Sequence, residues 1–135
     1  MDRLTPERRS WLMSRVRSRD TRPEMTVRHA LHQLGYRYRL HERKLPGCPD
    51  LVFAARHKVI MVHGCFWHGH SCKYGRAVSK TNVSFWTSKI ERNRERDRRV
   101  GKELKKLGWQ VHLVWECAVK KDQWLEDVLA FLERH

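Results

Sequence analysis

The chain has 135 residues, the length of one ordinary domain, and 40% of them are hydrophobic, which is enough for a buried core without disulfides. Lys and Arg number 29 against 15 Asp and Glu, a formal net charge of +14 that favours a polyanionic partner. No apolar run reaches the roughly 18 residues of a membrane helix and no signal peptide follows Met1, so we expect a cytoplasmic protein that binds nucleic acid rather than a membrane.

The N-terminal segment is rich in arginine. Residues 1–20 are predicted to form a basic arm with a short helix at 6–16, and arginines including Arg15 and Arg17 are expected to contact backbone phosphates. No linker, repeat or low-complexity stretch follows, so residues 1–135 are predicted to fold as a single domain.

A helix is predicted after the arm. Asp20 and Thr21 offer capping oxygens, Pro23 suits a first helical turn, and Gly35 is a typical helix stop. The apolar positions recur at helical spacing and define a buried stripe: Val27, Leu31 and Leu34. Glu24 falls on that same stripe, at the N-terminal end of the helix.

The remaining elements predict the fold class. In chain order, they are strands at 36–40, 51–53 and 58–63, a helix at 82–107 ended by Gly108, a strand at 109–115 and a helix at 122–132. This order is typical of an α/β domain with a mixed central sheet flanked by helices.

Cysteine and histidine gather after the third strand. Cys65, His70 and Cys72 fall within eight residues, and thiolate and imidazole ligands in that density favour a structural Zn²⁺ site over buried, unliganded side chains. A tetrahedral site requires a fourth ligand. Cys117, just after a strand end, is the preferred candidate, and His68 is the alternative because it is nearer in sequence.

A proline–aspartate pair opens the second strand. Asp50 follows Pro49, and the next strand lies at hairpin distance, an arrangement that resembles the core of PD-(D/E)xK nucleases. Pro-Asp is also common in ordinary turns. The second half of that motif differs here, since Val62 and His63 stand where an acidic residue and a lysine would be expected.

Longer blocks make the resemblance specific. The most distinctive are Leu45–Asp50 (LPGCPD) and His63–Cys72 (HGCFWHGHSC), followed by Phe85–Trp86, Glu95–Arg99 and Val114–Cys117. Together with the arm, they resemble the very-short-patch repair (Vsr) endonuclease family over nearly the whole chain. The resemblance implies a restriction-endonuclease-like core of the PD-(D/E)xK type and an enzyme of the bacterial cytosol.

The resemblance also implies catalytic roles. Asp50 would ligate a catalytic Mg²⁺ with the backbone carbonyl of Val62, His68 would be the general base, His63 would support the scissile phosphate or the attacking water, and Glu24 would hold metal-bound water. One carboxylate with phosphate and water suits Mg²⁺, and histidine suits proton abstraction near neutral pH. Read from its position alone, a glutamate at a helix start more often pairs with the helix dipole. The histidines outside the loop are expected at the surface: His29, His32, His41 and His57.

DNA recognition is assigned to aromatic and polar side chains. The resemblance implies that Phe66, Trp67 and Trp86 wedge between base pairs beside a mismatch, where unstacking costs least. Packing in the core is the alternative for each. Lys89 and Asn93, one helical turn apart, are expected to contact bases.

The predicted function is a Mg²⁺-dependent, strand-specific endonuclease that nicks beside the T of a T:G mismatch, the product of 5-methylcytosine deamination. The alternatives are a nuclease of this fold with relaxed or restriction-like specificity, and a zinc-stapled DNA-binding protein without catalysis. A monomer suits an asymmetric single-strand cut, and mismatch-repair proteins are possible further partners.

Overall fold

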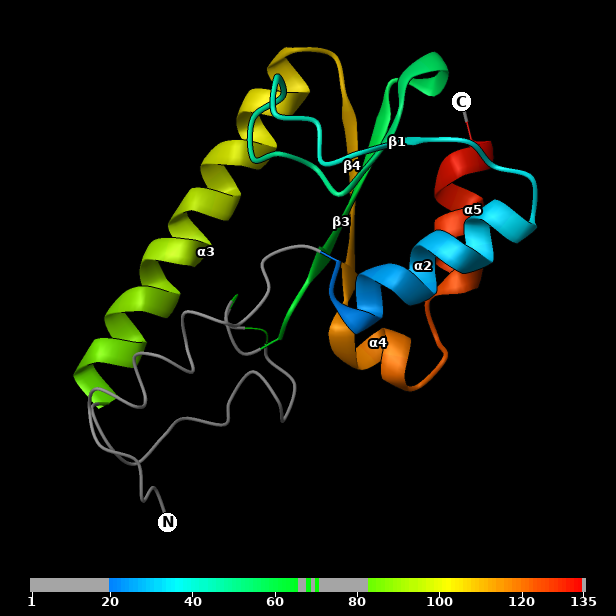
Figure 1. Cartoon of the computed structure of the whole chain (residues 1–135). Coiled ribbons are helices and arrows are strands. Elements are labelled where there is room, and N and C mark those ends of the chain that lie inside the picture. Colours follow the sequence, from blue (N-terminus) through cyan, green and yellow to red (C-terminus); the bar gives the residue numbers. More distant parts are fainter. Residues whose placement is uncertain (1–19, 66–67, 69, 71–82, 135) are drawn as a thin grey trace.

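The computed structural model describes residues 20–65, 68, 70 and 83–134, and its centre is a four-stranded mixed sheet. The strands lie in the order β1 (Arg39–Leu40), β2 (Leu51–Phe53), β3 (Lys58–His63) and β4 (Gln110–Trp115). The first three pair antiparallel, and β4 runs parallel to β3. Figure 1 shows helices on both sides of the sheet, which confirms the predicted α/β class.

The helices divide between the two faces of the sheet. The long α3 (Val83–Lys106) lies along one side, and the other side carries α2 (Arg22–Gln33), α4 (Glu116–Lys120) and α5 (Leu125–Glu133) (Figure 1). A short 3₁₀ turn, η1 (Ala54–Arg56), joins β2 to β3. Among the described residues, no helix combines the length and the apolar character that crossing a membrane requires.

Alternating strand residues build one core on each face, as the period of two in a strand requires. On the α2 and α5 face, Leu51 and Ile60 are fully buried with Val27 and Leu31. On the α3 face the core is smaller, and its buried members are Val52, Val59, Met61, Val100 and Leu104. The sheet is therefore buried on both sides at β3.

The start of α2 follows the expected capping chemistry. The Thr21 hydroxyl accepts the backbone N–H of Glu24 at 3.4 Å, and Gly35 takes a left-handed φ of 98° just after the helix. Glu24 lies on the buried stripe and is 2% exposed, as predicted. Leu34 departs from the prediction. It is the C-cap residue, just past the last residue of α2, and its side chain is 54% exposed.

Two elements differ from the predicted pattern. Only Arg39 and Leu40 of the segment 36–40 form a strand, because the rings of Tyr36 and Tyr38 turn to pack edge-on against Phe53. The final helical segment is divided in two. Helix α4 was not predicted, since five residues are too few to show a helical period, and a left-handed Asp122 separates it from α5.

Some predicted features lie outside the described residues. These are the arm before Asp20 with its helix at 6–16, Arg15, Arg17, Phe66, Trp67 and Cys72.

Candidate active site and metal centres

Asp50 lies at the point where the β2–β3 ladder ends. Its Oδ2 atom accepts the backbone N–H of Val62 at 2.8 Å, and its side chain is 15% exposed. The N–H and C=O of one strand residue point toward the same side of the strand. The Val62 carbonyl therefore faces the side on which the Asp50 carboxylate lies, so two oxygen donors adjoin at this strand end.

Glu24 brings a second buried carboxylate to Asp50 from helix α2. Its Oε1 accepts the backbone N–H of Asp20 at 3.0 Å, and its Oε2 accepts from Arg28 Nη1 at 3.2 Å. The imidazole of His41 donates to the same Oε2 at 2.8 Å and lies 3.9 Å from Asp50 Oδ1. Atoms of Asp20, Glu24 and His41 that could ligate a metal ion all fall within 4.8 Å of one another. The helix start and the strand start thus form one acidic pocket.

The pocket raises the pKa of Asp50 to about 7. Burial is the main cause, and the negative charge and hydrogen bond of Glu24 and the charge of Asp20 add to it, while the N–H of Val62 opposes it. Two carboxylates this close repel each other once both are ionised. A cation bound between them would relieve that repulsion, which makes this pocket a candidate metal site.

His68 and Asp97 form a pair at the same end of β3, because His68 stacks on His63, the residue that follows Val62. His68 Nδ1 donates to Asp97 Oδ2 at 2.6 Å, although the two residues lie 29 positions apart in the sequence. Burial raises the pKa of Asp97, but the hydrogen bond and positive charge of His68 outweigh it and leave that pKa below its ordinary value. Asp97 therefore stays ionised and holds the proton on Nδ1, which leaves Nε2 of His68 as the basic nitrogen.

His63 stacks on His68 and is neutral. The ring centroids are 3.8 Å apart with an angle of 8° between planes. Burial, followed by the positive charge of His68, lowers the pKa of His63 to about 4. Its side chain is 7% exposed, and its Nδ1 finds no hydrogen-bond partner among the described residues. His63 is thus uncharged at neutral pH because of its own burial, and His68 is the histidine of the stacked pair that is bonded to a carboxylate.

Sequence reasoning missed both Asp97 and His41. Asp97 had a signal, because it precedes Val100 by three residues and Leu104 by seven and so shares the buried stripe of α3. His41 had none. The prediction that it lies at the surface is wrong: its side chain is 12% exposed, and a left-handed backbone (φ 48°) turns it toward Glu24. The other three histidines of that prediction are exposed.

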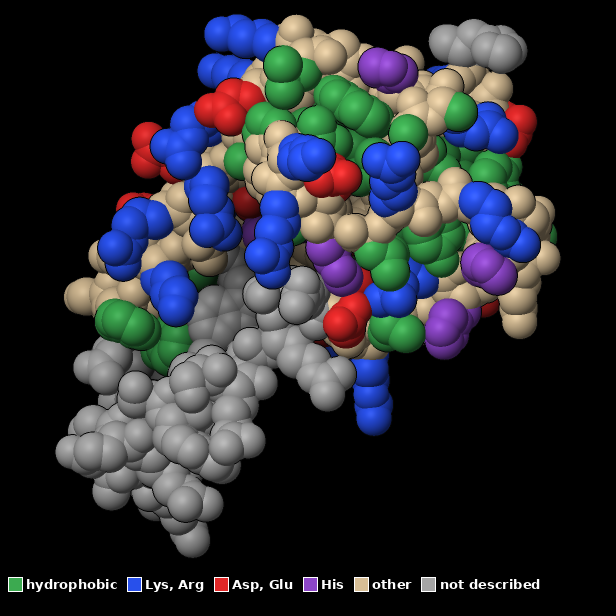
Figure 2. Space-filling view, turned by 45° about the horizontal axis from the view of Figure 1, so that its top comes forward, with side chains coloured by type: hydrophobic (Ala, Val, Ile, Leu, Met, Phe, Trp, Pro, Cys, Tyr) green, Lys and Arg blue, Asp and Glu red, His purple; other side chains and the backbone are tan. Residues whose placement is uncertain are grey.

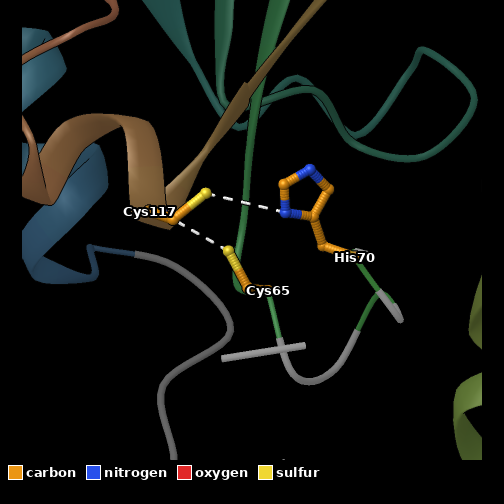
Figure 3. Close-up of side chains that lie close together, drawn as sticks. All are labelled: Cys65, His70 and Cys117. Atoms are coloured by element: carbon orange, nitrogen blue, oxygen red, sulfur yellow. Dashed lines mark hydrogen bonds between the residues drawn. The ribbon is translucent and has the colours of Figure 1, made fainter. Parts of the chain in front are cut away.

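A separate cluster joins Cys65, His70 and Cys117, which come from two segments, the loop after β3 and the start of α4 (Figure 3). Cys117 Sγ lies 3.6 Å from His70 Nδ1, and the backbone N–H of Cys117 donates to Cys65 Sγ at 3.3 Å. Sulfur and nitrogen ligands at about 2.3 and 2.0 Å from a tetrahedral zinc stand about 3.6 Å apart. The spacing therefore fits a zinc site without rearrangement.

The cluster also bears on the choice of a fourth ligand. Cys117 lies with Cys65 and His70, whereas His68 is bonded to Asp97 in the other group. The structure thus brings Cys117, the preferred candidate, together with two of the other predicted ligands. The remaining predicted ligand, Cys72, lies outside the described residues.

Helix α3 carries the predicted DNA-contacting residues. Lys89 is exposed and Asn93 is half-buried, while Trp86 is 6% exposed and its neighbour Phe85 is 54% exposed. Figure 2 shows Lys and Arg side chains gathered over α3. The exposed basic residues of this helix are Lys89, Arg92, Arg94, Arg96, Arg98, Arg99, Lys102, Lys105 and Lys106. Such a surface suits a polyanion.

Comparisons with known proteins agree with this chemistry. Residues 1–74 match the family model described as DNA mismatch endonuclease Vsr. A type II nicking enzyme of Xanthomonas oryzae, V.XorIIP, is 54% identical over 86% of this chain and 85% of its own length. The DNA mismatch endonuclease Vsr of Escherichia coli is 43% identical over 88% of this chain and 76% of its own length. A type II nicking enzyme of Neisseria meningitidis, V.NmeAIP, is 43% identical over 88% of this chain and 84% of its own length.

Proposed function

Because the chain belongs to the Vsr family of DNA mismatch endonucleases and is an endodeoxyribonuclease, we propose that it nicks one strand of a duplex beside the T of a T:G mismatch, in a Mg²⁺-dependent reaction. The observation that carries this proposal is the convergence of the acidic pocket at Asp50 with the His68–Asp97 pair at one end of the sheet. Together they offer a cation site and a base.

The proposed fold type is the PD-(D/E)xK nuclease core, built by residues 1–135 as one domain. The β2–β3 hairpin supports it, since Asp50 opens one strand and Val62 lies near the end of the next. The usual second acid and lysine are replaced here by Val62 and His63. Glu24 supplies the second carboxylate from α2 instead.

The donor set of the pocket fits Mg²⁺. The Asp50 carboxylate and the Val62 carbonyl are hard oxygen donors, and Mg²⁺ binds through one or two carboxylates while keeping several waters. The bound ion would stabilise negative charge on the scissile phosphate. Glu24 would orient water on the α2 side of the site.

The proton chemistry is assigned to the stacked histidines. His68 would accept the proton of the attacking water at Nε2, and Asp97 would stabilise the imidazolium that forms. His63, neutral at working pH, would hold the phosphate or the water by hydrogen bonding. The division of roles follows from burial and from the Asp97 contact.

Replacing Asp97 with Asn is expected to lower kcat by about 10²-fold, because the amide no longer fixes the His68 proton on Nδ1 or stabilises its positive charge. Single-turnover nicking measured from pH 5 to 9 should show the acidic limb of the rate profile displaced, because a general base must be unprotonated to act. Glu103→Gln, which neutralises an exposed acid of the same helix, is the control. An unchanged rate and pH profile in Asp97→Asn would rule out the pair.

A structural Zn²⁺ is proposed at Cys65, His70, Cys72 and Cys117. The 3.6 Å spacing of Cys117 and His70 supports it. The N–H donated to Cys65 Sγ is the kind of contact that stabilises a ligating thiolate. Zinc there would connect the loop after β3, which carries His68, to the start of α4.

DNA reading is proposed for residues on α3 and the loop before it. Phe66, Trp67 and Trp86 would wedge at the mismatch, and Lys89 and Asn93 would contact bases. Arg15 and Arg17 would contact phosphates. The basic surface of α3 supports a duplex on this side of the molecule (Figure 2). We propose a monomer in the bacterial cytosol, with mismatch-repair proteins as further partners.

A nicking enzyme with relaxed or restriction-like specificity is the second candidate. The relatives named type II nicking enzymes favour it, since that name states nicking and does not mention a mismatch. A non-catalytic zinc-stapled binder is not supported, because the family and its relatives are endonucleases.

The deciding assay uses two duplexes, one with a central T:G mismatch and one fully paired, each labelled on both strands, in Mg²⁺. Cleavage confined to the T strand of the mismatched duplex is the expected result. Equal nicking of the paired duplex would instead establish relaxed specificity. The assay requires a panel of flanking sequences, so that one unsuitable context is not mistaken for inactivity.

A further inference from the structure

We propose that His41 is a positioning residue of this active site, which holds the Glu24 carboxylate beside Asp50. The inference rests on the proposed function for its effect on nicking. The contacts that carry it are independent of substrate.

The contacts that Glu24 makes within helix α2 and its N-terminal flank do not by themselves fix the orientation of its side chain. A glutamate side chain is flexible. Glu24 is buried, its Oε1 accepts the backbone N–H of Asp20, and its carboxyl group also shares a hydrogen bond with the side chain of Asp50. On Oε2, the guanidinium of Arg28 is shared, because it lies closer to Asp20 Oδ1 (2.7 Å) than to Glu24 (3.2 Å). Asp20 and Arg28 belong to α2 or its N-terminal flank. Neither connects Glu24 to the sheet, and the hydrogen bond between Glu24 and Asp50 needs a proton that is absent once both carboxylates are ionised.

His41 supplies that connection. It follows β1 and is tied to Asp50 through the backbone, since the His41 N–H donates to the Asp50 carbonyl at 3.1 Å. Its ring then reaches Glu24 Oε2 at 2.8 Å, the shortest contact on that oxygen among the described residues. One residue therefore sets the distance between a carboxylate of α2 and the start of β2.

The backbone conformation of His41 supports this role. Its φ of 48° is left-handed, a conformation that costs free energy for a residue with a Cβ and that directs the side chain inward. The imidazole is 12% exposed and has Asp50 Oδ1 as its next acidic neighbour, at 3.9 Å. Removing the ring would leave the carboxylate free to rotate away from Asp50.

The first test compares two replacements. His41→Ala is expected to lower kcat by about tenfold, in the range seen when partners that orient active-site groups are lost. His41→Gln keeps a side-chain N–H donor and should stay close to wild type, and so should the control His32→Ala at an exposed histidine of α2. Equal losses in His41→Ala and His41→Gln would overturn a hydrogen-bonding role.

The second test is a double-mutant cycle with Glu24→Gln. If His41 acts through Glu24, adding His41→Ala to Glu24→Gln should cause little further loss of kcat, whereas independent roles would give multiplied losses and overturn the proposal. A crystal structure of His41→Ala gives a readout besides activity. The Glu24 carboxylate should move away from Asp50, and an unmoved carboxylate would also overturn the proposal.

These outcomes separate the inference from the proposed function. If wild type nicks paired and mismatched duplexes alike, the proposed specificity fails, yet the comparison of His41 variants on that nicking still stands. If wild type is specific for T:G and His41→Ala is fully active, only the role of His41 fails.

Discussion

Asp50→Asn is expected to reduce nicking by about 10³-fold or more and, at the same time, to make the protein without Mg²⁺ more stable at neutral pH. Activity falls because the variant loses the carboxylate that is bonded to Val62, and a bound metal supplies several kcal/mol of transition-state stabilisation. Stability rises because a neutral amide no longer faces Glu24 as a second negative charge.

The pH dependence follows from the direction of the Asp50 shift. Its pKa rises from 3.8 to about 7 on folding, so the native state holds a proton that the unfolded chain has released between these values. The unfolding free energy of wild type should therefore fall as pH rises from about 4 to 7, by on the order of 3 kcal/mol from this group. Asp50→Asn should lack that contribution.

Urea unfolding at pH 5 and pH 7, in buffer without Mg²⁺ or chelator, measures both parts of this prediction. A chelator is avoided because it would also remove zinc. Glu126→Gln, at an exposed acid of α5, is a matched control that should keep the slope of wild type. Identical slopes in wild type and Asp50→Asn would contradict the buried, carboxylate-facing environment of Asp50.

Cys117→Ser is expected to release the proposed zinc and to destabilise the protein by several kcal/mol. The side chain is buried against His70, and zinc binding contributes to folding, with apparent values of about 10–16 kcal/mol in zinc-finger peptides. Nicking should also fall, because the loop that carries His68 loses its connection to α4. The measurements are zinc content by mass spectrometry and melting temperature.

Cys48→Ser is the matched control, since Cys48 is exposed and lies apart from the candidate metal groups among the described residues. It should keep full zinc content and an unchanged melting temperature. Wild-type zinc content and stability in Cys117→Ser would show that this thiol is not a ligand. A loss in both variants would point instead to general sensitivity to cysteine replacement.

Local sequence signals predicted most of the elements. The strands at 51–53 and 58–63 match β2 and β3, and the long helix and the strand after it match within a residue at each end. Period and capping act between neighbouring residues, so they can be recognised in a single sequence. The extent of β1 was less predictable. Tyr36 and Tyr38 belong to the predicted strand, but their rings pack against Phe53 and the strand begins only at Arg39.

The sequence by itself determined the chemistry that the chain contains: a positive charge that requires a polyanion, a Cys/His loop, and a strand-initial aspartate within a family pattern. Only the tertiary structure decided which groups meet. His68 contacts Asp97 across 29 residues, and His41 reaches Glu24 across 17. Such pairs form because helices dock on a sheet, and docking depends on the summed packing of two cores rather than on any local spacing. A sequence read alone therefore gives the ligands and bases, while the fold selects their partners.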